Sequence, residues 1–175
     1  MASLMENFSN PEIDISSLPQ FEEVEFQPVS SQLLKKELLG LGIFFCIVIV
    51  AFSAAVFFEV NPYFLYAALV LIPLYFIFNI WNIFKMQKEY GYALREKDIV
   101  FKRGYLVHRT TVVPLNRIQH ATVSRGVFDK LLGISTLNIF TAGGSGSDIG
   151  IPGLLPETAL QLKEKLSQNI SEDEE

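Results

Sequence analysis

The side chains best suited to chemistry in this sequence are two histidines, His108 and His120, in a segment rich in β-branched residues. Histidine can serve as a metal ligand, but a zinc site needs at least three protein ligands and usually four. The single cysteine, Cys46, lies in an apolar run, and no HxxxH spacing accompanies the histidines. The sequence therefore predicts neither a metal site nor a bound cofactor.

A nucleophilic triad can be drawn on paper from Ser124, either histidine, and Asp98 or Asp129. No nucleophile-elbow sequence surrounds the serine, and a chain of this length offers such triples by chance. The GGSG run at residues 143–146 lacks the lysine and the following helix of a phosphate-binding loop, so it predicts a hairpin loop. We therefore interpret the chain as a non-enzymatic protein.

Two apolar runs without a charged residue, Leu38 to Phe58 and Tyr63 to Phe84, raise the hydrophobic fraction of the chain to 50%. At about 1.5 Å per residue, each run forms a helix of roughly 32 Å, enough to cross the ~30 Å hydrocarbon core of a bilayer. Only residues 59–62 separate the runs, so the chain must turn straight back. The pattern predicts a transmembrane helical hairpin, in preference to two buried core helices of a soluble protein.

Positive charges flank the outer ends of both runs: Lys35 and Lys36 before the first, Lys85 and Lys88 after the second. The connection between the runs carries only Glu59. By the positive-inside rule, both termini are then cytoplasmic, and the protein is a two-pass protein of the inner cell membrane. No ionisable residue lies at mid-membrane, which argues against a transporter or a channel.

The net charge of −5 conceals an uneven distribution along the chain. Residues 1–34 carry six acidic and no basic side chains, whereas residues 85–133 carry ten basic and four acidic ones. The basic block follows the second run directly, where anionic lipids favour each nearby Lys or Arg by about 1 kcal/mol. We expect no nucleic-acid partner, because no recognised binding motif accompanies the charges. The candidates for lipid-headgroup contact are Lys85, Lys88, Lys97, Lys102, Arg103 and Arg109.

From Tyr90 onward, short runs of β-branched and aromatic residues alternate with turn residues. A helical turn at Val127–Leu132 ends at Gly133, and apolar residues spaced by three or four after Pro156 predict an amphipathic helix that includes Ile170. The fold class is therefore α+β: a transmembrane α-helical hairpin, then a small antiparallel β-barrel or sandwich capped by a C-terminal helix. The predicted strands are Tyr90 to Arg95, Ile99 to Arg103, Tyr105 to Val113, Arg117 to Arg125, Ser135 to Thr141 and Ser147 to Ile151.

Three segments of this β-rich part carry a family resemblance. GYLVHRTTVVPLNRIQH at 104–120, VFDKLLG at 127–133 and LNIFTAG at 137–143 resemble the bacterial pleckstrin-homology (PH) domain of YdbS-like membrane proteins. The preceding hairpin is similar to the layout of that family, and the resemblance covers residues 35–170. It implies a PH-like fold at the inner membrane face, often in proteins encoded beside a larger relative with repeated units of the same kind.

This interpretation divides the chain into an acidic, largely disordered N-terminal tail (1–34), the two-helix transmembrane hairpin (35–88), a cytoplasmic PH-like domain (89–170) and an acidic tail (171–175). The leading hypothesis is that the domain binds or scaffolds a protein partner, such as a paralogous PH-domain membrane protein, with contact to anionic lipid. The alternative is an accessory subunit of a transport or envelope-stress system that acts through Ala51, Ala55 and Pro73 of its hairpin.

Overall fold

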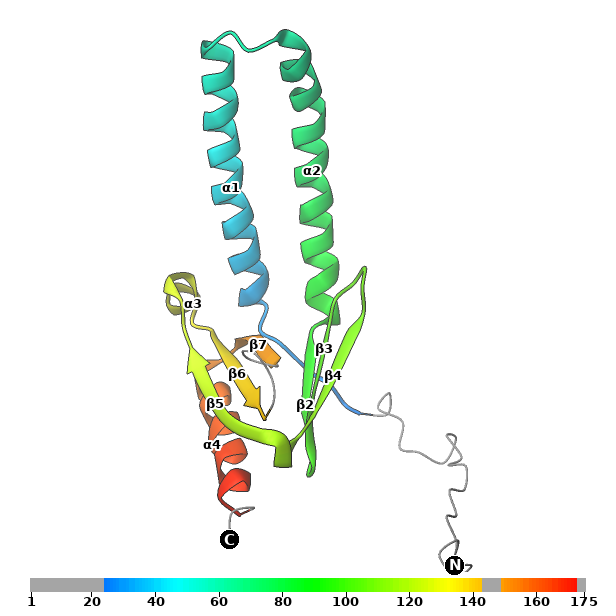
Figure 1. Ribbon diagram of the computed structural model, residues 1–175, viewed down its shortest axis with the longest axis vertical. Coiled ribbons are helices and arrows are strands. Elements are labelled where there is room, and N and C mark those ends of the chain that lie inside the picture. The colour runs from blue at the N-terminus through cyan, green and yellow to red at the C-terminus, as the bar shows by residue number, and fades with distance from the viewer. Residues whose placement is uncertain (1–23, 143–148, 173–175) are drawn as a thin grey trace, which may run out of the picture.

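A computed structural model describes residues 24–142 and 149–172, and side chains through residue 168. Figure 1 shows a long helical hairpin at one end of the molecule and a β-rich domain at the other. The elements in chain order are β1 (Gln27–Pro28), α1 (Gln32–Phe57), α2 (Pro62–Glu89), β2 (Gly91–Leu94), β3 (Asp98–Arg103), β4 (Arg109–Pro114), the 3-10 helix η3 (Leu115–Arg117), β5 (Ile118–Ser124), α3 (Val127–Leu132), β6 (Ser135–Thr141), β7 (Ile149–Leu154) and α4 (Pro156–Glu172).

The helices α1 and α2 contain the two apolar runs, except for Phe58, which caps the end of α1. Both helices extend beyond the runs at the end nearer the domain. Asn61 begins α2, because its side-chain oxygen accepts a hydrogen bond from the Tyr63 amide at 3.1 Å. Between the helices, Phe76 is buried and its ring meets that of Phe45 edge to face, with centroids 4.7 Å apart. Most of the other large apolar side chains of the hairpin are exposed, so it requires a lipid environment.

The β domain is a sandwich of two antiparallel sheets, ordered β1-β2-β3-β4 and β5-β6-β7. Buried residues alternate with partly exposed ones along β6, and Leu137 and Ile139 point into the core between the sheets. The amphipathic helix α4 covers this core with Ala159, Leu162 and Leu166. The predicted α+β class is confirmed in its sandwich form, because the sheets do not close into a barrel.

Most predicted strands agree with the structure within one or two residues, but the predicted strand Tyr105 to Val113 begins only at Arg109. Residues 104–108 instead form the turn between β3 and β4. Gly104 has a φ of +94°, and a Cβ atom there would collide with the carbonyl oxygen of Val107, so a glycine is required. The fourth predicted strand begins at Ile118 instead of Arg117, after η3.

Several expectations fall partly on residues outside the described ranges. These are the GGSG loop at 143–146, the start of the strand predicted at Ser147, the side chain of Ile170, and the tails at 1–23 and 173–175. The strand itself is described from Ile149 and continues to Leu154. Residues 171 and 172 were expected in the acidic tail but belong to α4.

The hairpin is inserted into the β domain between two of its strands, so that β1 precedes it and β2 follows it. Gln27 pairs with Tyr92 and Pro28 with Gly91, which adds β1 to the edge of the first sheet. Val29 and Leu33 are buried in the domain core. The structure thus differs from the tail expected at 1–34. Burial of the apolar side chains of Val29 and Leu33 stabilises the end of this segment, although its composition is acidic.

The contact between Leu33 and Gly153 of β7 gives a test of this insertion. Gly153 has a φ of +72°, and a Cβ atom there would lie 2.9 Å from the Leu33 Cβ. We expect Gly153→Ala to lower the unfolding temperature of the full-length chain in detergent. The left-handed φ costs roughly 1–2 kcal/mol, and overpacking adds about 1–3 kcal/mol.

The matched control is Gly133→Ala, where φ is +66° but no atom lies within 4 Å of the added Cβ. It carries only the cost of the left-handed backbone. Thermal unfolding of both variants separates the two contributions. Equal losses of stability would contradict the close packing of Leu33 against β7.

Candidate functional site at the base of the hairpin

The candidate site is the region where the domain meets the hairpin, and it is built from two projections. Figure 1 shows the β3–β4 turn beside the base of α2 and the short helix α3 beside the base of α1, on opposite sides of the hairpin. Both projections come from the β domain and point toward the transmembrane helices. Each is attached to its helix by specific side-chain contacts.

On the α2 side, aromatic and ionic contacts fix the β3–β4 turn. The ring of Tyr105 meets that of Trp81 edge to face, with centroids 5.4 Å apart. The Lys85 ammonium lies 5.5 Å from the centre of the Tyr105 ring, within range of a cation–π interaction. The Lys102 Nζ atom lies 3.3 Å from a carboxylate oxygen of Glu89. The turn is therefore held at the level of Trp81 on α2.

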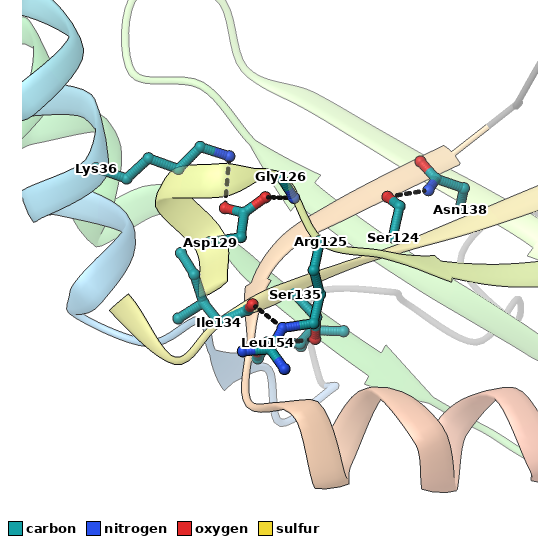
Figure 2. Close-up of polar contacts among 9 residues, drawn as sticks. All are labelled: Lys36, Ser124, Arg125, Gly126, Asp129, Ile134, Ser135, Asn138 and Leu154. Carbon is teal, nitrogen blue, oxygen red and sulfur yellow. Dashed lines mark hydrogen bonds and ion pairs between the residues drawn. The ribbon is translucent and has the colours of Figure 1, made fainter. Parts of the chain in front are cut away.

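On the α1 side, one buried carboxylate fixes α3, as Figure 2 shows. Lys36 Nζ lies 2.7 Å from Asp129 Oδ1, and the Gly126 amide donates a hydrogen bond to Asp129 Oδ2 at 2.9 Å. Burial alone raises the pKa of Asp129, but Lys36, the Gly126 amide and Arg125 together lower it below its usual value. Asp129 is therefore a carboxylate at neutral pH, and the ion pair ties α3 to α1.

Five of the six basic residues expected to contact headgroups lie around this base. Lys85 and Lys88 are exposed on the last turns of α2. Lys102 and Arg103 end β3, and Arg109 begins β4 directly opposite Arg103. Lys97 is different, because it lies in the β2–β3 turn, at the end of the sheet remote from the hairpin. The sequence pattern did not indicate that Lys97 lies apart from the other five residues, because the direction in which a strand runs is a property of the fold.

The residues considered for catalysis are dispersed and engaged elsewhere. His108 and His120 were expected on adjacent strands, but β4 and β5 belong to different sheets, and His108 lies in the turn before β4. The His120 ring stacks on Phe140, with centroids 4.3 Å apart. Ser124 Oγ accepts a hydrogen bond from the Asn138 amide at 2.9 Å (Figure 2). Within residues 24–142 and 149–172, no three potential metal ligands form a group.

The two attachments of the site were not predicted from the sequence. Asp129 was a candidate only for a catalytic triple, and nothing in the sequence paired Trp81 with Tyr105. Asp98, the other acid of that triple, accepts two hydrogen bonds of 2.6 Å from Arg95. One signal was available for Asp129: it is the single acidic residue in the otherwise apolar and basic run VFDKLL.

Comparison with known proteins identifies the domain. A family model described as "Bacterial PH domain" matches residues 38–170, which include most of the hairpin and the part of the β domain that follows it. The chain belongs to the bacterial PH domain family. No solved structure shows a significant match to this bacterial PH domain protein.

Two curated relatives from Bacillus subtilis (strain 168) support this assignment. The chain is 32% identical over 81 residues to "UPF0699 transmembrane protein YdbS" and 28% identical over 82 residues to "UPF0699 transmembrane protein YdbT". Each alignment covers 46% of the chain, but only 49% of YdbS and 17% of YdbT. With its two exposed apolar helices, this bacterial PH domain protein is therefore a membrane protein with two passes.

The Lys36–Asp129 pair generates a prediction about stability. Replacement Asp129→Asn removes the negative charge that pairs with Lys36. It also leaves one side-chain oxygen, where the carboxylate has one oxygen for Lys36 and another for the Gly126 amide. Because Lys36 keeps access to water, we expect a loss of about 1–3 kcal/mol. The measurement is thermal unfolding of the full-length chain in detergent. The control is Asp98→Asn, whose pair with Arg95 is more exposed, so we expect a smaller loss.

The same pair predicts a pH dependence. A carboxyl group whose pKa is lowered in the folded state contributes stability above its unfolded pKa, and this contribution is lost as pH falls through the folded pKa. The advantage of the natural chain over Asp129→Asn should thus be complete above the ordinary pKa of 3.8 and disappear in more acidic buffer. An advantage independent of pH would show that the ion pair does not stabilise the fold.

Proposed function

We propose that this bacterial PH domain protein is a non-enzymatic interaction module of the inner cell membrane, with both termini in the cytoplasm. In this proposal the domain binds a protein partner at the inner face of the membrane. The observation that carries the proposal is the attachment of the domain to both ends of the hairpin, through β1 and Leu33 on one side and β2 on the other. A domain held at two points keeps one face toward the bilayer and presents the rest to partners.

The orientation is supported by the distribution of basic residues. Lys36, Lys85 and Lys88 all lie at the end of the hairpin that carries the domain, and the opposite turn has Glu59. Positive charge of this kind is typical of the cytoplasmic side. The domain then lies beside anionic headgroups, where each nearby Lys or Arg contributes about 1 kcal/mol before screening.

For headgroup contact we propose the five basic residues at the base of the hairpin, and we leave Lys97 out because of its position. Lys102 already pairs with Glu89, and Lys85 lies against the Tyr105 ring. Among the five, the exposed side chains of Lys88, Arg103 and Arg109 are then the best placed to reach phosphate groups. Their contribution depends on charge alone and should weaken with added salt.

For the protein partner we propose the free edge of β4. In the part of the chain that the structure describes, β4 is the last strand of its sheet and pairs only with β3. Val112 on this edge strand is 44% exposed. An exposed edge strand can accept a strand from another protein. Because β4 starts near the membrane and spans about 20 Å, a partner in the same membrane, such as a paralogous PH-domain protein, can reach it.

The alternative is an accessory subunit that contacts a larger transport or envelope-stress protein through its hairpin. One observation favours it: a wholly apolar hollow of about 120 Å³ lies between α1 and α2, and Pro73 and Ala68 are in its lining. Of the two alanines proposed for this contact, Ala51 is exposed and Ala55 is half-buried. Neither alanine lines the hollow, and a partner helix that contacts the two alanines would reach the exposed Ala51 first.

Site-specific photo-crosslinking in native membranes distinguishes the two proposals. A photoreactive amino acid replaces Val112 on β4, Ala51 on α1 or Leu160 on α4, which is 49% exposed and serves as the matched control. We expect an adduct from position 112, absent at 160, with a PH-domain membrane protein identified by mass spectrometry. An adduct only from position 51 would favour the accessory subunit. No adduct from either position, or equal labelling at 160, would contradict both.

A further inference from the structure

The helix α3 buries an acidic side chain and exposes large apolar ones, which is unusual for a helix packed on a soluble domain. Its buried residue is Asp129, which is only 6% exposed, whereas Val127 and Leu131 are each 74% exposed. Val127 and Leu131 are four residues apart and therefore share one face, and Phe128 lies beside them. A folded domain in water would bury these side chains and expose the acid, so α3 is suited to an apolar environment.

The β3–β4 turn has the same character. Leu106 is 60% exposed and Val107 is 74% exposed at its tip, although they follow a residue that packs closely on α2. That residue is Tyr105, which contacts Trp81. The close turn at Gly104 fixes the direction of the tip. We name these two exposed groups the β3–β4 tip (Leu106 and Val107) and the α3 tip (Val127, Phe128 and Leu131).

The attachments set both tips at the depth of the membrane boundary. The α3 tip is attached through Lys36, which precedes the apolar run beginning at Leu38 by two residues, or about 3 Å along a helix. The β3–β4 tip is attached at Trp81, three residues inside the run that ends at Phe84, or about 4.5 Å. The polar headgroup region on each side of a bilayer is roughly 5–8 Å thick. Both tips therefore lie where headgroups meet acyl chains.

Basic residues flank each tip. Arg103 and Arg109 lie on either side of the β3–β4 tip, and the exposed Lys130 lies on α3 beside the α3 tip. Arg125, which precedes α3, instead donates a hydrogen bond from its Nε atom to the carbonyl oxygen of Ile134 at 3.1 Å (Figure 2). An apolar tip with basic neighbours matches the order of chemistry across an anionic membrane surface, with acyl chains inside and phosphates outside. A binding site for a soluble protein would not need this order of apolar and basic residues at the same depth on both sides of the hairpin.

We propose that the β3–β4 tip and the α3 tip insert into the phospholipid monolayer on either side of the hairpin, as a two-pronged lipid-binding surface. The ligand class is bilayer phospholipid: acyl chains contact the five apolar side chains, and phosphates contact the basic neighbours. This surface goes beyond the proposed partner site on β4 and does not depend on it. Together the hairpin and the two tips fix the domain in depth and in tilt.

The test uses the full-length chain in nanodiscs of phosphatidylethanolamine and phosphatidylglycerol. In a Cys46→Ser background, Val107→Cys, Leu131→Cys and the control Leu160→Cys each carry an environment-sensitive fluorophore. We expect phospholipids with a spin label on the acyl chain to quench the probes at 107 and 131 several-fold more than the probe at 160. Iodide in the water should quench them in the reverse order.

Unlabelled cysteines provide a second measurement that does not involve a bulky probe. All three positions are exposed in the structure, so slower reaction of 107 and 131 with a water-soluble maleimide, relative to 160, reports coverage by lipid. Equal quenching at all three positions would overturn the proposal. So would insertion of only one tip, or protection from both quenchers, which would indicate a second copy of the chain as the occupant.

Discussion

The structure depends on the attachment of the β domain to both helices of the membrane hairpin. Pairing of Gln27 and Pro28 with β2, and burial of Val29 and Leu33, place the start of α1 in the domain core. The end of α2 leads directly into β2. Without the pairing of β1 and the burial of Val29 and Leu33, the domain would be attached to α2 alone, and its distance from the bilayer would vary. With both, the positions of α3 and of the β3–β4 turn relative to the membrane are set.

Sequence patterns predicted the parts of the fold that local physics determines. A bilayer imposes a minimum apolar length, so the spans could be recognised. Runs of β-branched and aromatic residues between turn residues identified β3 and β6. The strand β1 gave no such signal, because two residues in an acidic segment are ordered only by partners distant in sequence. Tyr105, Leu106 and Val107 were assigned to a strand because aromatic and β-branched residues favour strands. Their position in a turn depends on Gly104.

The candidate site was predicted in part for the same reason. Charge alone located the basic residues near the end of the second span. The position of Lys97 could not be predicted in this way, because it depends on the direction in which β2 and β3 run. The attachments combine residues far apart in sequence, Lys36 with Asp129 and Trp81 with Tyr105, which no local pattern could pair. The two attachments also differ in the kind of interaction that holds them. The buried carboxylate requires its lysine, because an unpaired charge there would be costly, whereas the aromatic contact tolerates small movements.

Insertion of the hairpin between β1 and β2 also affects how the protein is made. During synthesis, β1 leaves the ribosome first and β2 follows only after both helices. The first sheet therefore cannot gain β1 as its edge strand until both helices have been made and have entered the membrane. If only one helix crossed, β1 and β2 would lie on opposite sides of the bilayer. The sheet would then lack its edge strand and the core would lack Val29 and Leu33. Folding of the domain is thereby coupled to correct membrane topology, so that a wrongly inserted chain is also an incompletely folded one.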